Sequence, residues 1–394
     1  MIFTPALLAA LLPLALAAPA PIDARAPIIA PRGAEIIPGK YIVKLKDGAS
    51  DAALNNAIGK VTTAKVDHVY KSGKFRGFAS KIDAANLEAI QALTDVEYIE
   101  QESVYKINTY VSQASAPWGL GRISFHAKGS TSYRYDDSAG AGTCSYVIDT
   151  GIYTAHAQFG GRATWLANYA DSSNTDGNGH GTHVAGTIGS TLYGVAKNTK
   201  LYAVKVLDAD GSGTTSGVIA GINFVATDAQ TRSCPNGTVA NMSLGGGLST
   251  TINSAAKALV SSGVFLAVAA GNDNANAANY SPASEPTACT VGATTSADAK
   301  ASYSNFGALV DIFAPGTSIL STWIGSTSAT NTISGTSMAS PHIAGLGAYL
   351  LTLTGKKTPA ALCAYIQSIA TNGVITGLAS GTTNKLAFNG NPTG

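Results

Sequence analysis

The stretch "LYAVKVLDADGSGTTSGVIAGINFVATDAQ" (residues 201–230) decides the fold class, because it joins two different apolar patterns. Residues 201–208 form a short, mostly apolar run that predicts a buried strand, whereas 216–229 have helical spacing. Further strands are predicted at 144–151, 239–247 and 264–272, and a further helix at 252–262. This alternation predicts an α/β unit, in which helices cover both faces of a parallel sheet.

Three of the predicted strands end in polar or glycine-rich tips. These tips begin at Asp149 ("DTG"), at Ser243 ("SLGGG") and at Ala270 ("AGN"). In parallel sheets, sites form at the carboxyl ends of the strands. Asp149 follows an apolar run, and a buried carboxylate is costly unless it is paired. An imidazole N–H would satisfy it.

A histidine opens a run of small residues in "DGNGHGTHVAGTIGS" (176–190). His180 has three interpretations from its surroundings alone. It can be a polar group that is merely satisfied at the start of a buried helix, or a metal ligand together with His183 and Asp176. It can also be a general base, because an imidazole titrates near neutral pH.

The segment "ISGTSMASPHIAG" (333–345) surrounds Ser337 with small side chains and then reads as a helix. One interpretation is a Ser/Gly-rich loop that leads into a buried helix. The other is a nucleophile exposed at a helix N-terminus, where free N–H groups favour negative charge. We expect Pro341 to lie in the first turn, where its missing N–H has no intrahelical partner.

The chain changes composition near residue 110. Residues 1–110 hold 12 of the 25 Lys/Arg and 11 of the 23 Asp/Glu, which leaves 13 and 12 for the other 284 positions. The charge-rich part predicts strands at 40–46, 75–82 and 96–102, and helices at 49–59 and 84–94. A small α+β sandwich follows from that order. Residues 103–119 read as an exposed linker.

The composition and net charge of the chain exclude some classes of function. With 45% hydrophobic residues and a net charge of +2, the chain is globular, and neither nucleic acid nor membrane is expected as a partner. Residues 1–20 form an apolar run that ends in small residues and favours a secretory signal over a buried N-terminal helix. In a secreted chain, four cysteines indicate two disulfides, and three pairings remain open.

Asp149, His180 and Ser337 occur in an order found in one family of serine proteases. With the motifs "YVIDTG", "NGHGTHVAGT", "NMSLGGG", "VAAGNDN", "SPASEP" and "GTSMASPH", residues 111–390 resemble the subtilisin-like serine proteases, in particular the fungal proteinase K group. The resemblance implies that Ser337 is the nucleophile, His180 the general base and Asp149 its orienting carboxylate. It implies that the Asn272 amide donates to the oxyanion.

The same resemblance assigns the substrate-binding surface. "DGSGTTSG" (210–217) resembles an edge segment to which a substrate adds as a strand. The glycine-rich tips resemble the walls of a pocket for a large apolar side chain, so broad endopeptidase activity with aromatic or aliphatic residues before the cut is expected. The residues implied are Gly211, Ser212, Gly213, Ser243, Leu244, Gly245, Ala269, Ala270 and Gly271.

The resemblance also implies the disulfides and one structural calcium ion. It pairs Cys144 with Cys234 and Cys289 with Cys363. It implies that calcium is bound by the carbonyl groups of Pro286 and Ala288 and by the carboxylate of Asp311, which are oxygen ligands suited to that cation. The family's second calcium site needs an aspartate that residues 370–378 lack, and Val184 stands where the family has a free cysteine.

Residues 36–107 resemble the family's inhibitory propeptide. We therefore expect a signal peptide (1–18), a propeptide (19–110) and a catalytic domain (111–394), with self-cleavage between residues 107 and 113 and Tyr110–Val111 as the candidate bond. The expected partners are protein and peptide substrates and the chain's own propeptide, and the mature form is expected to be a monomer.

Two alternatives remain. One is a metal-dependent hydrolase that uses His180, His183 and Asp149, although the two histidines lack the i, i+4 helical spacing of HExxH. The other is a non-catalytic relative that binds peptides.

Overall fold

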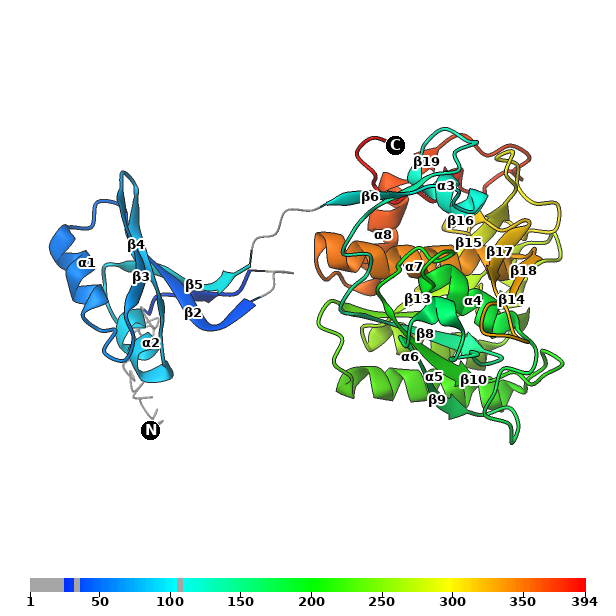
Figure 1. Ribbon diagram of the computed structural model, residues 1–394, viewed down its shortest axis with the longest axis horizontal. Helices are drawn as coiled ribbons and strands as arrows, with labels where there is room; N and C mark the ends of the chain where they lie inside the picture. Colours follow the sequence, from blue (N-terminus) through cyan, green and yellow to red (C-terminus); the bar gives the residue numbers. More distant parts are fainter. Residues whose placement is uncertain (1–24, 32–35, 105–108) are drawn as a thin grey trace, which may run out of the picture. The chain divides into compact units, whose positions relative to one another are not determined.

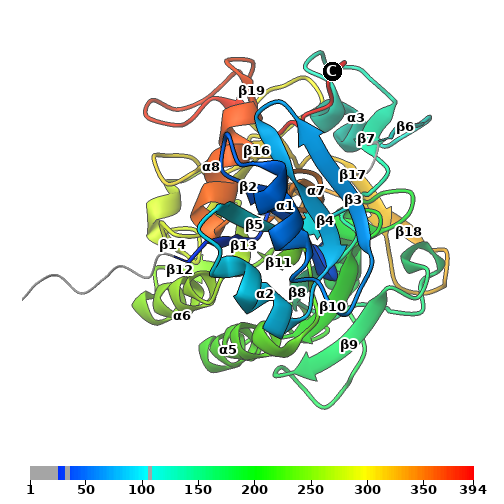
Figure 2. The ribbon, with the colours of Figure 1, turned by 90° about the vertical axis from the view of Figure 1, so that its left-hand side faces the viewer.

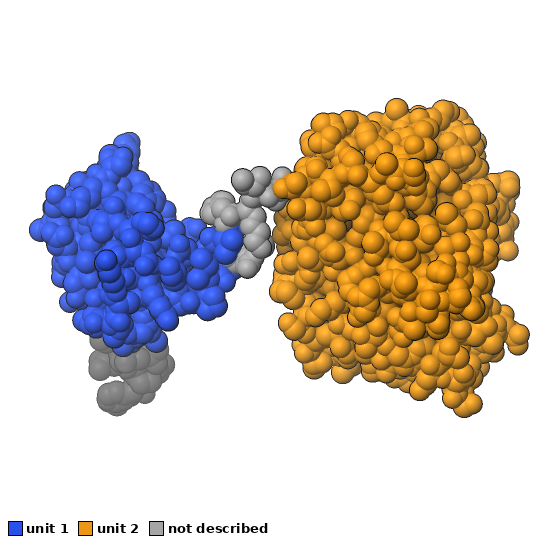
Figure 3. Space-filling model, in the orientation of Figure 1, with its two compact units in different colours: residues 1–105 blue, residues 106–394 orange. Residues whose placement is uncertain are grey.

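The computed structural model describes residues 25–31, 36–104 and 109–394. The predicted signal peptide, residues 1–18, lies outside this part. The chain divides into two compact units, residues 1–105 and 106–394 (Figures 1 and 3). No helix in the described part is long and apolar enough to cross a membrane.

Unit 1 is a five-stranded sheet with the order β1-β5-β2-β4-β3, and its two helices pack on it. Leu54 of α1 and Ile90 of α2 share a core with Val43 and Phe78 of the sheet. The α+β prediction for this region is confirmed, but β3 was missed because its sequence, VDHVYKS, is mostly polar and exposed. The elements are β1 (Ile28–Ile29), β2 (Ile36–Leu45), α1 (Asp51–Ile58), β3 (Val66–Ser72), β4 (Phe75–Lys81), α2 (Ala84–Gln91) and β5 (Val96–Ser103).

Unit 2 is built on a nine-stranded sheet with the order β19-β20-β16-β15-β13-β11-β8-β10-β9. All neighbouring strands are parallel except β19 and β20. Figures 1 and 2 show β9 at one edge and β19 at the other. The strands are β8 (Thr143–Asp149), β9 (Ala163–Asn168), β10 (Lys200–Lys205), β11 (Gly237–Met242), β13 (Phe265–Ala269), β15 (Cys289–Thr294), β16 (Ile312–Pro315), β19 (Thr371–Asn372) and β20 (Lys385–Leu386).

Helices cover both faces of this sheet. Successive residues of a strand point to opposite faces, so each strand contributes side chains to the core on either side. Val147 of β8 packs in the core that contains α4, α7 and α8, whereas Tyr146 and Ile148 pack in the core that contains α5 and α6. Both faces are therefore buried, as expected for a parallel sheet. The helices are α4 (His180–Gly189), α5 (Thr215–Thr231), α6 (Thr250–Ser261), α7 (Thr336–Thr354) and α8 (Pro359–Ile369).

Two segments differ from their predictions. The strand expected at 239–247 ends at Met242, and Gly246–Gly247 form a separate strand, β12, which pairs with β14 (Tyr280–Ser281). The predicted linker 103–119 contains β6 (Tyr110–Gln113), which pairs antiparallel with β7 (Tyr133–Asp136), and the start of α3 (Trp118–Ser124). These short elements depend on distant partners rather than on a local apolar pattern.

Two disulfides tie the sheet of unit 2 to its surroundings. Cys144 of β8 is joined to Cys234, and Cys289 of β15 is joined to Cys363 of α8. The loops that they close span 90 and 74 residues, and long closed loops remove the most entropy from the unfolded chain. These are the two pairs that the resemblance implies.

Candidate active site

A carboxylate and an imidazole meet at the carboxyl end of the sheet. Asp149 ends β8 and is fully buried, and its Oδ1 lies 2.7 Å from Nδ1 of His180, the first residue of α4. Helix α4 approaches the end of β8 closely because residue 181 is glycine, where a Cβ would lie 2.1 Å from the Gly151 carbonyl oxygen. The contact fixes which ring nitrogen faces the carboxylate and leaves Nε2 free for other chemistry.

The electrostatics of His180 follow from this pair. Burial alone lowers the pKa of His180, but the charge of Asp149 and its hydrogen bond outweigh this effect. The pKa of His180 therefore lies above its ordinary value of 6.5. Such a group accepts a proton readily, and the buried carboxylate stabilises the imidazolium that results.

The other residues of the metal alternative are occupied elsewhere. The Asp176 carboxylate accepts hydrogen bonds from Thr150, Asn178, Gly179 and Thr182, and so organises the loop in front of α4. His183 Nε2 lies 2.9 Å from the Ile319 carbonyl oxygen, and burial lowers the pKa of His183 to about 4. His183 is a neutral structural residue, so this geometry favours the base interpretation of His180.

Ser337 is the second residue of α7 and is held by a reciprocal pair of hydrogen bonds. Its hydroxyl donates to the Ser243 carbonyl oxygen at 3.0 Å, and the Ser243 hydroxyl donates to the Ser337 carbonyl oxygen at 2.7 Å. The expected position of Pro341 is wrong, since it is the sixth residue of α7 rather than part of the first turn. Pro341 cannot donate to the Ser337 carbonyl four residues before it, and Ser243 supplies that hydrogen bond instead.

Asn272 follows β13 with its amide oriented by α7. Its Oδ1 accepts hydrogen bonds from the Thr336 N–H at 2.8 Å and from the Thr336 hydroxyl at 2.9 Å. Both bonds use the oxygen, which leaves the amide NH₂ group of Asn272 for another acceptor. Gly271 makes the turn possible, with φ of 103° and the Asn305 amide where a Cβ would lie.

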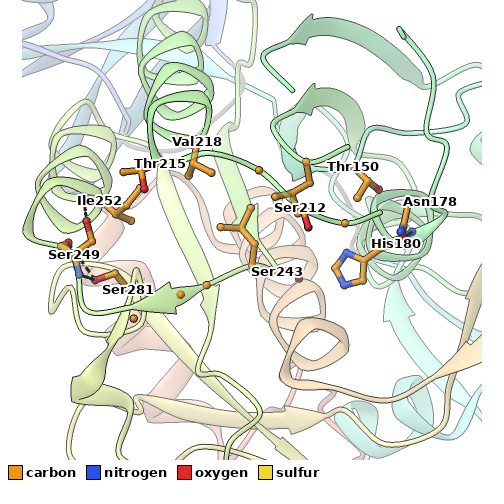
Figure 4. A pocket seen from close by; sticks show the side chains of 17 residues that line it. Thr150, Asn178, His180, Ser212, Thr215, Val218, Ser243, Ser249, Ile252 and Ser281 are labelled. Carbon is orange, nitrogen blue, oxygen red and sulfur yellow. Dashed lines mark hydrogen bonds between the residues drawn. The ribbon is translucent and has the colours of Figure 1, made fainter. Parts of the chain in front are cut away.

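Two adjoining cavities surround these residues. The first, about 540 Å³, is lined by His180, by 211–213 and by 243–247 (Figure 4). The second, about 340 Å³, is lined by 244–247, by 269–272 and by Ser337. Every residue expected to bind substrate lines one of the two, and 244–247 line both. Leu244 supplies an apolar surface, and the glycines leave room for a chain to lie between 211–213 and 245–247.

Sequence reasoning missed some residues that shape the site and gave Asp176 a different role, as a candidate metal ligand. Thr336 orients Asn272, and Asp176 holds the loop before His180, as described above. Ser281 of β14 lines both cavities. Thr336 lies inside the quoted motif "GTSMASPH", which was the only available signal for it. Ser281 opens the quoted motif "SPASEP", but it reaches the cavities through the β12–β14 pairing, which no local pattern indicates.

Asp311, the carboxylate expected to bind calcium, lies beside the disulfide Cys289–Cys363. Asp311 Oδ2 accepts from the Thr290 N–H at 2.8 Å, whereas Oδ1 has only the Gln367 amide at 3.5 Å. Burial raises the pKa of Asp311 to about 6, so a cation at its free oxygen would stabilise the carboxylate. This donor chemistry fits a hard cation.

Comparison with known proteins agrees with this geometry. Residues 140–386 match the subtilase family, and residues 40–108 match the peptidase inhibitor I9 family. The chain is 62% identical to the subtilisin-like serine protease AsES of Sarocladium strictum, over 98% of this chain and 99% of that protein. It is 57% identical to a cuticle-degrading protease of Metarhizium anisopliae, over 96% and 98%. It is 54% identical to proteinase R of Parengyodontium album, over 97% and 98%.

A solved structure gives the same result. The crystal structure of a cold adapted subtilisin-like serine proteinase matches with a TM-score of 0.66 and 46% identity. The match covers 70% of this chain and 99% of that chain.

Proposed function

The chain belongs to the subtilase family and is a serine protease with an I9 inhibitor region before it, and we propose that Asp149, His180 and Ser337 are its catalytic residues. The observation that carries this proposal is the 2.7 Å contact between Asp149 Oδ1 and His180 Nδ1. It holds the ring with Nε2 directed away from the carboxylate, as a general base for a serine requires. Neither the metal-dependent hydrolase nor the non-catalytic relative has support.

In this mechanism the Ser337 hydroxyl rotates from the Ser243 carbonyl toward His180 Nε2. His180 takes the hydroxyl proton while Ser337 Oγ attacks the substrate carbonyl, and His180 then protonates the leaving amine. The Asn272 NH₂ group and the Ser337 N–H donate to the oxyanion that forms. The Ser337 N–H is available because the first N–H groups of a helix have no intrahelical partner.

The two cavities support broad endopeptidase specificity. An extended substrate adds its backbone between Gly211–Gly213 and Gly245–Gly247, which recognises the main chain and makes few demands on side chains. The cavity between 244–247 and 269–271 takes the side chain before the cut, and we propose that it prefers aromatic or aliphatic residues. A relative named for degrading cuticle is consistent with structural proteins as substrates.

The protein is proposed to be secreted as a zymogen, with the signal peptide, propeptide and catalytic domain at the boundaries given above. The mature enzyme then begins at Val111. Residues 110–113 pair with β7, and Val111 lines a cavity apart from the one that contains His180. Cleavage of Tyr110–Val111 by Ser337 therefore requires this segment to leave β7 first. After cleavage, residues 111–113 can pair with β7 again.

One calcium ion is proposed to bind at Asp311 with the carbonyl groups of Pro286 and Ala288. The ion would stabilise the fold near the disulfide Cys289–Cys363 and would take no part in the reaction. A chelator should lower the unfolding temperature of wild-type enzyme and not that of Asp311→Asn. Equal shifts in both proteins would contradict this assignment.

An active-site experiment tests the proposed function. A serine-directed sulfonyl fluoride should abolish peptide hydrolysis and add its mass to the peptide that contains Ser337. Ser337→Ala should remove hydrolysis, leave the chain uncut and prevent labelling. Full activity of Ser337→Ala, or labelling at another serine, would refute the assignment of the nucleophile.

A further inference from the structure

Buried polar atoms without partners gather at the ribbon formed by β6 and β7. Nine buried side-chain polar atoms in the described part of the chain have no hydrogen-bond partner. Four of the nine lie in or beside this ribbon, on Gln113, Arg134, Asp136 and Ser138. Buried polar groups in native proteins are normally hydrogen-bonded, so four unpaired atoms in one place need a physical explanation.

Asp136 is the most informative of these residues. Its side chain is 1% exposed, and its Oδ1 accepts only the Ser138 N–H, at 3.0 Å. Its backbone N–H donates to the Tyr349 hydroxyl at 2.9 Å. The second carboxylate oxygen, Oδ2, is buried and accepts nothing. A carboxylate in such a position needs a cation or a hydrogen-bond donor.

Strand register shows what lies opposite Asp136. Tyr110 of β6 faces Asp136, and Val111 faces Tyr135. Burial and the nearby charge of Asp136 raise the pKa of Tyr110. The guanidinium of Arg134 lies 5.8 Å from the centre of the Tyr110 ring. In the uncut chain, the ring of Tyr110 therefore lies close to Asp136, whose Oδ2 accepts no hydrogen bond, and to Arg134, whose Nε donates none.

We propose that Asp136 is the binding site for the α-ammonium group of Val111, which maturation creates. The inference rests on the proposed cut at Tyr110–Val111. Hydrolysis of that bond places the oxygen of water on the new Tyr110 carboxylate and both of its hydrogens on the Val111 nitrogen. The nitrogen changes from a neutral amide with one N–H to a cation with three.

Register explains why this nitrogen can reach Asp136. The nitrogen of Val111 is bonded directly to the carbonyl carbon of Tyr110, the residue that faces Asp136. When Tyr110 departs with the propeptide, its ring leaves the space beside the carboxylate. One N–H of the ammonium can keep the strand pairing with Tyr135, and the others are free for Asp136 Oδ2. The ion pair forms only in the cut chain, and so it stabilises the mature enzyme and not the precursor.

Other groups near this site provide the alternatives that a test must separate. Arg134 is the second cation within reach of Asp136, and it could pair with the carboxylate once Tyr110 has left. The remaining titratable or charged groups that face the site are Tyr135 of β7, Asp137 directly after β7, Tyr349 of α7, Tyr365 of α8, and Lys197 and Arg162, which line a cavity with Val111.

The pKa of the Val111 α-amino group is the first measurement. It is read from the pH dependence of the acetylation rate of the N-terminal peptide in folded mature enzyme. We expect a pKa above the value of about 7.7–8.0 for a free α-amino group in wild type, and a value near that range in Asp136→Asn. The exposed neighbour provides a matched control, since Asp137→Asn should behave as wild type. The same pKa in wild type and Asp136→Asn would overturn the proposal, with Arg134 then the partner of Asp136.

Thermal unfolding is the second measurement. Asp136→Asn should lower the unfolding temperature of inhibited mature enzyme by about 4 °C at pH 7. The same change in the uncut Ser337→Ala precursor should have little effect on the unfolding of the catalytic unit. Because the pKa of the Val111 α-amino group is raised in the folded state, the difference in unfolding temperature between wild type and Asp136→Asn is complete below the pKa of the free amine. This difference disappears as pH rises through the pKa of the amine in the folded enzyme. Equal losses in cut and uncut chains would contradict the inference.

N-terminal sequencing separates this inference from the proposed function. An active enzyme that begins at a residue other than Val111 would overturn the Asp136 site and leave the catalytic assignment intact. If the catalytic assignment were wrong, the Ser337→Ala variant would instead be fully active.

Discussion

The hydroxyl of Ser243 donates to the carbonyl oxygen of Ser337 at 2.7 Å, and so replaces the helical hydrogen bond that Pro341 cannot make. Ser243 follows β11, and Ser337 lies in the first turn of α7. The bond therefore ties the helix that carries the nucleophile to the end of the sheet. Ser243 Oγ also accepts from the Asn241 amide at 2.8 Å, which fixes the direction of its hydroxyl.

Ser243→Ala should lower the free energy of unfolding by about 1–3 kcal/mol, because it leaves the Ser337 carbonyl and the Asn241 amide without partners. The loss should be smaller in a Pro341→Ala background, where the new N–H of residue 341 can donate to the Ser337 carbonyl. Denaturant unfolding of the four inhibited enzymes measures the coupling. Equal losses in both backgrounds would show that proline and Ser243 act independently.

Asp149→Asn should reduce kcat by about 10⁴, the loss found for the equivalent change in another serine protease, because the amide stabilises the wrong ring tautomer. The pH profile gives a second readout. His180 must be neutral to act as a base, so kcat/KM falls as pH decreases through its pKa, which lies above 6.5 in wild type. Without the charge of Asp149, residual activity should persist to lower pH. Asp137→Asn is the control, and an unchanged acid limb in Asp149→Asn would contradict the pairing.

Asn272→Leu should reduce kcat by about 10²–10³ with little change in KM, the loss measured for the corresponding donor in a subtilisin. Asn272→Asp keeps the oxygen that accepts from Thr336 and removes the NH₂ donor. It should therefore retain more stability than Asn272→Leu and still lose activity. Steady-state kinetics and thermal unfolding together separate the two roles, with exposed Asn174→Ala as control. Wild-type kcat in both variants would exclude Asn272 as an oxyanion donor.

Asp298→Asn should lower the free energy of unfolding by about 3–5 kcal/mol, because it leaves a buried guanidinium without its counter-charge. Arg122 is 2% exposed, and its Nε and Nη2 lie 2.7 and 3.3 Å from the two carboxylate oxygens of Asp298. Arg232→Gln, which breaks the more exposed pair with Asp228, should lose only about 1 kcal/mol. Denaturant unfolding of inhibited enzyme compares the two, and similar losses would argue against burial as the cause.

Local pattern predicted the layers of the fold well. The alternation of apolar strands and helical segments in residues 144–272 placed β8, β10, α5 and α6 close to their observed bounds. The strands predicted at 239–247 and 264–272 begin near β11 and β13 but continue past the ends of these strands at Met242 and Ala269. It failed for β3 and β6, which are short and mostly polar or half-exposed. β3 pairs with the next strand, β4, and β6 pairs with β7 across helix α3. Both strands are held by the backbone of their partner, and their own side chains show no clear apolar alternation.

The sequence by itself determined which groups are available for chemistry: a carboxylate after a buried strand, an imidazole before a helix of small residues, and a serine in a glycine-rich turn. It could also place them at one edge of the sheet, because the carboxyl ends of parallel strands share an edge. Only the tertiary structure decided how those groups point. The Ser337 hydroxyl faces the Ser243 carbonyl, Thr336 turns the Asn272 amide, and Arg122 pairs with Asp298 across 176 residues. Hydrogen bonds depend on distance and direction between atoms, and residues far apart in the chain acquire both only when the core packs.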